Sequence, residues 1–189
     1  MRRSRDSDTE THTLSVLVDN EAGVLARVVG LFSGRGYNIE SLTVTEVDHS
    51  GHLSRMTIVT TGRVHVIEQI KAQLERLIPV HSVVDLTVEG QSVQREVGLL
   101  KVRRGAGGSP EISEIAREFG ATEIWSGEDC LVLELTGDPV RIDQLADRLL
   151  ECGLLEIART GVVGMQVDPA SLDHAAVVST SDREAGPLS

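Results

Sequence analysis

The hydrophobic pattern of this chain occurs twice, and each occurrence predicts the same order of strands and helices. In the first half, residues 14–18 alternate apolar and other side chains, which is typical of a strand. Apolar residues then recur at helical spacing over 24–32, and Gly34 and Gly36 stand where such a helix would end. The elements expected next are strands at 39–47 and 53–61, a helix at 67–77 and a strand at 83–88. This order, β-α-β-β-α-β, is the ferredoxin-like plan.

The second half repeats that order. A strand is expected at 97–102, and Ser109 and Pro110 suit the N-cap and first position of a helix. Asp138 and Pro139 make a second start of this kind. The remaining elements are strands at 121–125 and 130–135, a helix with apolar residues from 142 to 150, and a last strand at 154–167. Gly161 and Gly164 weaken that last strand.

These patterns predict an α+β protein of two ferredoxin-like βαββαβ domains. We expect a disordered arm at 1–11, a first domain at 12–88, a linker at 89–94, a second domain at 95–168 and a flexible tail at 169–189. A domain of about 75 residues is small for independent stability. Because the helices cover only one face of each sheet, the other face or the sheet edge needs a partner. The chain is therefore expected to form a dimer.

Composition and charge argue against several classes of protein. Aromatic residues make up 2% of the chain, whereas single-stranded nucleic acid is usually bound by stacking on aromatic side chains. The net charge of -11 opposes a duplex-binding surface. No apolar run approaches the roughly 20 residues that span a bilayer. The N-terminus lacks the apolar core of a signal peptide, and Cys130 and Cys152 do not make a disulfide framework. We expect a cytoplasmic protein that binds neither nucleic acid nor a membrane.

The first candidate site is the segment Asp19–Leu25, between the first strand and the first helix. A helix N-terminus offers unpaired N–H groups and a partial positive charge, which attract carboxylates and phosphates. Gly23 lets a ligand approach the backbone, and Asn20 both donates and accepts hydrogen bonds. The alternative is that Asn20 only caps the helix and Gly23 only shapes the turn.

The second candidate site is the segment Gly34–Leu42, which leads into the second strand. Asn38 stands among apolar neighbours at the start of that strand. The alternative is an ordinary loop amide that bonds to its own backbone.

Together the two segments resemble a known family. The stretches DNEAGVLARVVGLFSGRGYNIESLTV and LSRMTIV are similar to the start of the small regulatory subunit of acetolactate synthase, which is an ACT domain. VGLLKV and FGATEIW fit the same family, so the resemblance runs from about Thr13 to Val167. It implies that valine or a related amino acid binds between the ACT domains of two chains. Many members carry Ser at the position of Ala26.

The resemblance also implies a role for individual residues. Asn20, Gly23 and Val24 would contribute from one chain, and Asn38 and Ile39 would approach from its neighbour. We hypothesise that the carboxylate of the amino acid meets the N–H groups of Gly23 and Val24.

In the same hypothesis, the branched side chain enters an aliphatic pocket near Leu25 and Ile39.

The implied partner is a large catalytic subunit that uses thiamine diphosphate, Mg²⁺ and FAD, with none of these cofactors held by the present chain. The chain would activate that subunit and confer feedback inhibition by valine, leucine or isoleucine. An ACT-domain sensor that regulates a different biosynthetic enzyme remains the alternative. A transcription regulator would need a basic DNA-reading element, and an enzyme would need a catalytic set; the sequence indicates neither.

Two other groups of residues are discounted. His49 and His52 flank a turn, but a metal site needs three or four ligands, so a solvated hairpin is the preferred interpretation. The run 103–108 is rich in glycine but lacks the Gly-Lys-Ser/Thr ending of a phosphate-binding loop.

Overall fold

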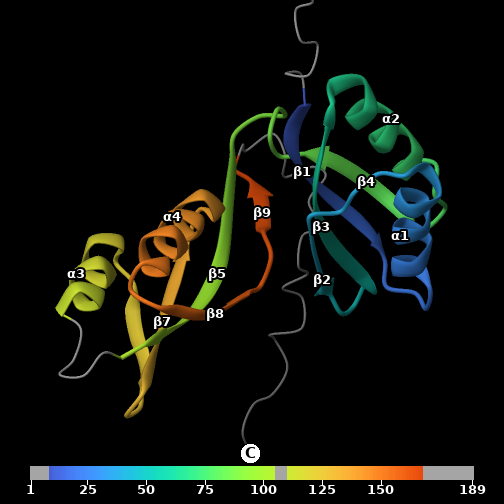
Figure 1. The fold of residues 1–189 in the computed structure, drawn as a ribbon. Helices are drawn as coiled ribbons and strands as arrows, with labels where there is room; N and C mark the ends of the chain where they lie inside the picture. The colour runs from blue at the N-terminus through green and yellow to red at the C-terminus, as the bar shows by residue number, and fades with distance from the viewer. Residues whose placement is uncertain (1–8, 105–109, 168–189) are drawn as a thin grey trace, which may run out of the picture. The chain divides into compact units, whose positions relative to one another are not determined.

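Two antiparallel sheets organise the residues that the computed structural model describes, which are 9–104 and 110–167. These residues divide into two units, one of 9–93 with 164–167 and one of 94–104 with 110–163. Each unit has its strands and helices in the order β-α-β-β-α-β (Figure 1), so the predicted pair of ferredoxin-like folds is confirmed.

In the first unit, two helices cover one face of a four-stranded sheet of order β2-β3-β1-β4 (Figure 1). Its elements are β1 (Thr9–Asp19), α1 (Val24–Arg35), β2 (Ser41–Asp48), β3 (Leu53–Arg63), α2 (Val64–Leu74) and β4 (Val80–Asp85). The alternating residues of β1 supply one wall of the core, and each helix buries one apolar stripe against it. The largest fully buried side chains of this core are Leu14, Phe32, Met56, Ile58, Ile67, Ile70 and Leu74.

The second unit has the same strand order, β6-β7-β5-β8. Its elements are β5 (Ser92–Arg103), α3 (Pro110–Phe119), β6 (Thr122–Ser126), β7 (Cys130–Gly137), α4 (Pro139–Leu150) and β8 (Leu154–Arg159). A last strand, β9 (Val163–Gln166), pairs with β5. The predicted start of α4 is confirmed, because the Asp138 carboxylate accepts the N–H of Val140 at 2.9 Å and Pro139 is the first helical residue.

The structure departs from the sequence prediction at several boundaries. β1 already begins at Thr9, within the stretch expected to be a disordered arm, since Thr9–Asp19 pairs along its whole length with β3. β5 begins at Ser92, inside the expected linker. The expected strand at 154–167 is two strands, because Gly161 adopts φ 83 between β8 and β9. Ser109, the predicted N-cap, and the predicted tail at 169–189 lie outside the described residues.

None of the helices in the described ranges is long and apolar enough to cross a membrane. The same residues contain no group of three or more His, Cys, Asp or Glu side chains placed to hold a metal ion.

Candidate functional site

The loop between β1 and α1 ends at a glycine whose backbone conformation begins the helix. Gly23 is the N-cap of α1 and adopts φ 88 and ψ -3, a left-handed conformation that disfavours residues with a Cβ. No side chain donates or accepts a capping hydrogen bond at this helix start. The alternative role of Asn20 as the helix cap is therefore wrong, and Asn20 is exposed.

The start of α1 retains free hydrogen-bond donors. The N–H of Val24 donates to the carbonyl of Glu21 at 3.3 Å. Within the described part of the chain, the N–H groups of Gly23, Leu25 and Ala26 have no acceptor. These groups lie at the positive end of the helix dipole, so they suit a carboxylate. The structure thus offers Leu25 and Ala26 as donors in place of Val24, whose side chain is buried in the core.

The residues around Asn20 are held by neighbours on both sides. The Asn20 N–H donates to the carbonyl of His52 at 2.6 Å, and the Asp19 N–H donates to the carbonyl of Pro79 at 2.8 Å. The Asp19 carboxylate also lies 2.6 Å from Nε2 of His81 on β4. These contacts fix the backbone of the loop and leave the Asn20 side chain open to solvent.

Asn38 lies in the loop that leaves the other end of α1. That helix ends at Gly36, which adopts φ 70. The hydroxyl of Thr60, a fully buried residue of β3, donates to the Asn38 carbonyl at 2.6 Å. Asn38 is exposed, and Ile39 packs against the core just before β2 begins. Ile39 therefore belongs to this loop and not to the strand in which the sequence analysis had placed it.

Asn20 and Asn38 stand at opposite ends of the same sheet. Asn20 contacts His52, directly before β3, and Asn38 contacts Thr60, eight residues farther along. At about 3.3 Å per strand residue, the two contacts are roughly 26 Å apart. Within one chain these asparagines cannot reach the same amino acid. The predicted site residues therefore form two separate groups, one at each end of α1.

One exposed face of α1 carries only very small side chains, and we call it the smooth face. Ala26, Gly30 and Gly34 follow one another at intervals of four, so they lie on one side of the helix. A Cβ added to Gly30 or Gly34 would meet nothing within 4 Å. Glycine inside a helix costs about 0.5–1 kcal/mol relative to alanine. Packing within the described chain gives no reason for that cost.

β2 is an edge strand of the sheet, next to β3 alone. Its outer backbone groups are a template for another strand. Val44, near its middle, is 43% exposed. The first unit thus presents an edge strand as well as a smooth helix face.

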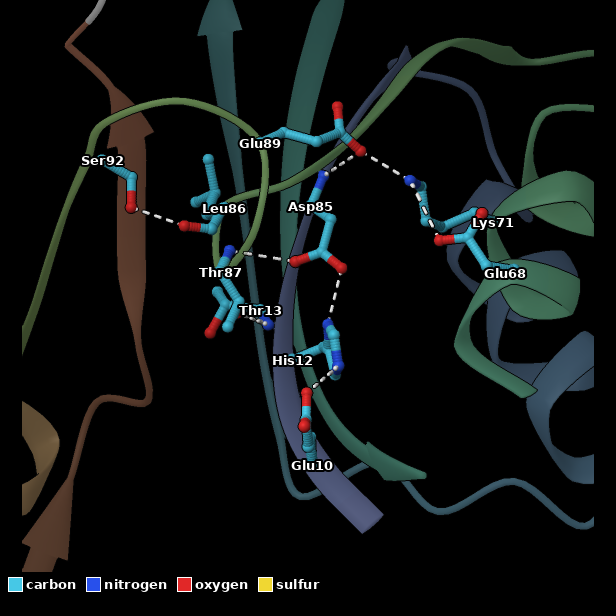
Figure 2. Close-up of polar contacts among 10 residues, drawn as sticks. All are labelled: Glu10, His12, Thr13, Glu68, Lys71, Asp85, Leu86, Thr87, Glu89 and Ser92. Carbon is cyan, nitrogen blue, oxygen red and sulfur yellow. Dashed lines mark hydrogen bonds and ion pairs between the residues drawn. The ribbon is translucent and has the colours of Figure 1, made fainter. Parts of the chain in front are cut away.

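The first unit also buries a group of charged side chains that the sequence analysis missed (Figure 2). His12 on β1 and Asp85 at the end of β4 are both buried, and Nδ1 of His12 lies 2.6 Å from a carboxylate oxygen of Asp85. An ionised carboxylate only accepts, so this nitrogen donates. The other Asp85 oxygen accepts the N–H of Thr87 at 2.9 Å. The signal was present in the sequence, since His12 continues the alternation of buried residues in β1.

A lysine on α2 extends this buried group. Nζ of Lys71 lies 2.5 Å from the carboxylate of Glu89 and 3.7 Å from that of Glu68. Burial alone would lower the pKa of Lys71, but its hydrogen bond to Glu89 and the surrounding negative charges hold that pKa above the ordinary value. The Glu89 carbonyl in turn accepts from the side-chain amide of Gln166 at 2.9 Å. The contacts tie the segment after β4 to α2, and that segment to the end of the described chain.

Two family models match the chain. Residues 14–82 match the model described as an AHAS small subunit-like ACT domain, and residues 95–168 match the model described as the small subunit of acetolactate synthase.

Individual relatives are similar over most of their length. The acetolactate synthase small subunit of Mycolicibacterium smegmatis is 42% identical over 167 residues, which are 88% of this chain and 97% of that protein. The corresponding protein of Mycobacterium leprae is 42% identical over 162 residues, which are 86% of this chain and 95% of that protein. A crystal structure of the acetolactate synthase small subunit of Thermotoga maritima is 35% identical, with a TM-score of 0.73 over 82% of this chain and 96% of that one.

Proposed function

The chain belongs to the family of acetolactate synthase small subunits, and from this premise we propose that it is the regulatory subunit of that enzyme. It activates a thiamine-diphosphate-dependent catalytic subunit and confers feedback inhibition by valine or a related branched-chain amino acid. The holoenzyme acts in the cytoplasm, in the synthesis of isoleucine, valine and leucine. Thiamine diphosphate, Mg²⁺ and FAD belong to the catalytic subunit, and this chain supplies regulation alone.

The chemistry of the α1 start supports an amino acid as effector. The carboxylate of the effector accepts hydrogen bonds from the open N–H groups of Gly23, Leu25 and Ala26. The Asn20 side chain binds one polar end of the effector. Val24 makes no direct contact with the effector, because its N–H bonds to Glu21 and its side chain is buried.

From a neighbouring chain, Asn38 binds the other polar end of the effector. The branched side chain of the effector packs between Leu25, which is 42% exposed, and Ile39 of that neighbour.

The observation that carries this proposal is the separation of about 26 Å between the contacts that the two asparagines make with His52 and Thr60, worked from the rise per residue along β3. A site that uses both needs two chains. In a twofold dimer, Asn20 of each chain can lie close to Asn38 of the other, so that the same site forms twice. If α1 packs antiparallel to its copy, with β2 at the shared edge, the start of each α1 meets the end of the other.

Regulation follows from a site that two chains share. An effector shifts an equilibrium only by its different affinity for the two states. Filling a site between chains favours one arrangement of those chains over another. Couplings of about 1–3 kcal/mol are usual, which corresponds to several-fold up to roughly a hundred-fold inhibition.

The test is a mixing experiment with Asn20→Ala and Asn38→Ala chains. Each variant homodimer lacks one asparagine in both of its sites, so neither binds valine in calorimetry. A dimer of one N20A chain and one N38A chain has one site that lacks both asparagines and one that is complete. After subunit exchange in an equal mixture, roughly a quarter of all sites are complete, as twofold symmetry requires.

Recovery of that fraction of valine binding supports the shared site. A site made by one chain gives no recovery, since every chain in the mixture lacks an asparagine. Co-purification of a large subunit, followed by inhibition assays of the holoenzyme with each variant, tests the partner. Failure to activate any acetolactate synthase catalytic subunit contradicts the proposal.

A further inference from the structure

The hairpin between β2 and β3 reaches the loop that carries Asn20. β1 and β3 pair up to Asp19 and Leu53, and the Asn20 N–H then adds one more bond to the carbonyl of His52 at 2.6 Å. The Glu21 N–H then bonds to the Asp19 carbonyl at 2.9 Å, before the chain turns at Gly23 into α1. The His52 carbonyl is thus the acceptor that holds the Asn20 N–H itself.

His52 is the only residue other than glycine in the described ranges with a positive φ, at 50. Residues with a Cβ rarely adopt this left-handed region, although His, Asn and Asp enter it more readily than most. Its side chain is exposed and, in the same ranges, makes no hydrogen bond or ion pair. The contacts of the imidazole therefore do not explain the positive φ of His52. The consequence of this conformation is the direction of the His52 backbone carbonyl.

The rest of the hairpin leads the chain into this conformation. One oxygen of Asp48 accepts from the hydroxyl and N–H of Ser50, at 2.7 and 2.9 Å, and from the N–H of Gly51 at 3.1 Å. The hydroxyl bond is the largest cause of a lowered pKa at Asp48. A Cβ at Gly51 would lie 2.7 Å from a carboxylate oxygen of Asp48, so a larger residue there would have to displace the Asp48 side chain. The register between β2 and β3 shifts at the same place, between Glu46 and Asp48.

We propose that His52 is a positioning residue for the effector site. Its left-handed backbone aims its carbonyl at the Asn20 N–H and so holds Asn20 beside the open donors of α1. This inference rests on the proposed function for its effect on valine, whereas its effect on the Asn20 backbone stands without it. Residues that adopt a positive φ easily should replace His52 without loss, and β-branched residues should not.

The test compares full-length His52→Gly, His52→Asn, His52→Ala and His52→Val with His49→Val as control. His49 is an exposed residue of the same hairpin with no positive φ. Hydrogen exchange of the Asn20 amide, followed by NMR, reports the bond directly, and calorimetry with valine reports the site. We expect wild-type behaviour from H52G, H52N and H49V. H52V should lose protection at Asn20 and bind valine several-fold more weakly, with H52A between, because histidine enters the left-handed region several-fold more readily than most residues with a Cβ.

Unchanged Asn20 exchange in both H52V and H52A overturns the inference. It is also overturned if either variant only lowers the unfolding temperature and binds valine normally, because the residue is then merely structural. If H52V fails to fold, H52A decides the matter in the same two measurements. A wild-type chain that binds no branched-chain amino acid contradicts the proposed function, and Asn20 exchange still decides the role of His52.

Discussion

Replacing Gly30 with alanine separates two explanations of the smooth face of α1. If this face meets only solvent, the added methyl stabilises the helix by about 0.8–1.0 kcal/mol. A change of this size raises the unfolding temperature of a domain of 60–100 residues by roughly 4–8 °C. The methyl contacts nothing within 4 Å among residues 9–104 and 110–167, so no clash there reduces this gain.

If the face packs against its copy in a dimer, the same methyl has the opposite effect. Extra methyl groups in a packed interface cost about 1–3 kcal/mol each, and twofold symmetry inserts two of them. The net cost of at least about 2 kcal/mol weakens dimerisation about thirty-fold or more. We therefore expect Gly30→Ala to raise the stability of the dilute monomer and to lower the fraction of dimer.

Sedimentation velocity and thermal unfolding over a range of protein concentrations measure both effects. Ala72→Gly is a matched control, since Ala72 is exposed on α2 of the same unit. It should destabilise the chain without changing assembly. A G30A chain that dimerises and binds valine as tightly as the wild type, and is simply more stable, refutes the assignment of this face to the interface.

Further predictions concern the buried charges and the candidate site. Asp85→Ala leaves the buried Nδ1 of His12 without its partner and should cost about 1–3 kcal/mol in urea unfolding, the usual cost of an unpaired buried polar group, whereas Lys101→Ala, at a solvent-exposed ion pair with Glu156, should change nothing measurable. The pKa of Lys71 is raised on folding, so its stabilising contribution is complete below the ordinary value of 10.5 and falls as pH rises through the higher folded value. The difference in unfolding free energy between wild type and Lys71→Met should therefore be constant at neutral pH and shrink in strong alkali; a difference that grows there contradicts the argument. Asn20→Ala should leave activation of the catalytic subunit intact and abolish inhibition by valine, and equal inhibition of both holoenzymes would count against this.

The spacing of apolar residues and the capping residues predicted most of the fold, because both depend on neighbours that are close in the sequence. The alternation of Leu14, Val16 and Val18 marks the core face of β1, and the Asp138–Pro139 pair marks the start of α4. The boundaries of β4 were harder to predict. The apolar run at 83–88 extends past Asp85, where the chain leaves the sheet and the Leu86 N–H bonds back to Thr13.

Contacts between distant residues were not predictable in this way. His12 and Asp85 are 73 positions apart and meet only because β4 pairs with β1 in one register. The alternation in β1 indicates that His12 is buried, but it does not indicate its partner, and Asp85 alone resembles an exposed polar residue. The left-handed backbone of His52 was hidden for a related reason, since a histidine beside a turn more often indicates a solvated hairpin. The roles of Asn20 and Asn38 came from the resemblance, and their separation came from the register of β3.

The return of β9 has a practical consequence for anyone who wishes to dissect this protein. The Val167 N–H bonds to the Gln91 carbonyl at 2.9 Å, and Gln166 bonds to Glu89, so the chain departs from the first unit after Val93 and rejoins it at Gly164. A fragment that stops at 93 discards those bonds. A fragment that joins Val93 to Gly164 through a short glycine-serine linker, without the residues between them, keeps those bonds. The second unit is in effect a domain inserted into the first, and domain insertions are generally tolerated at such sites.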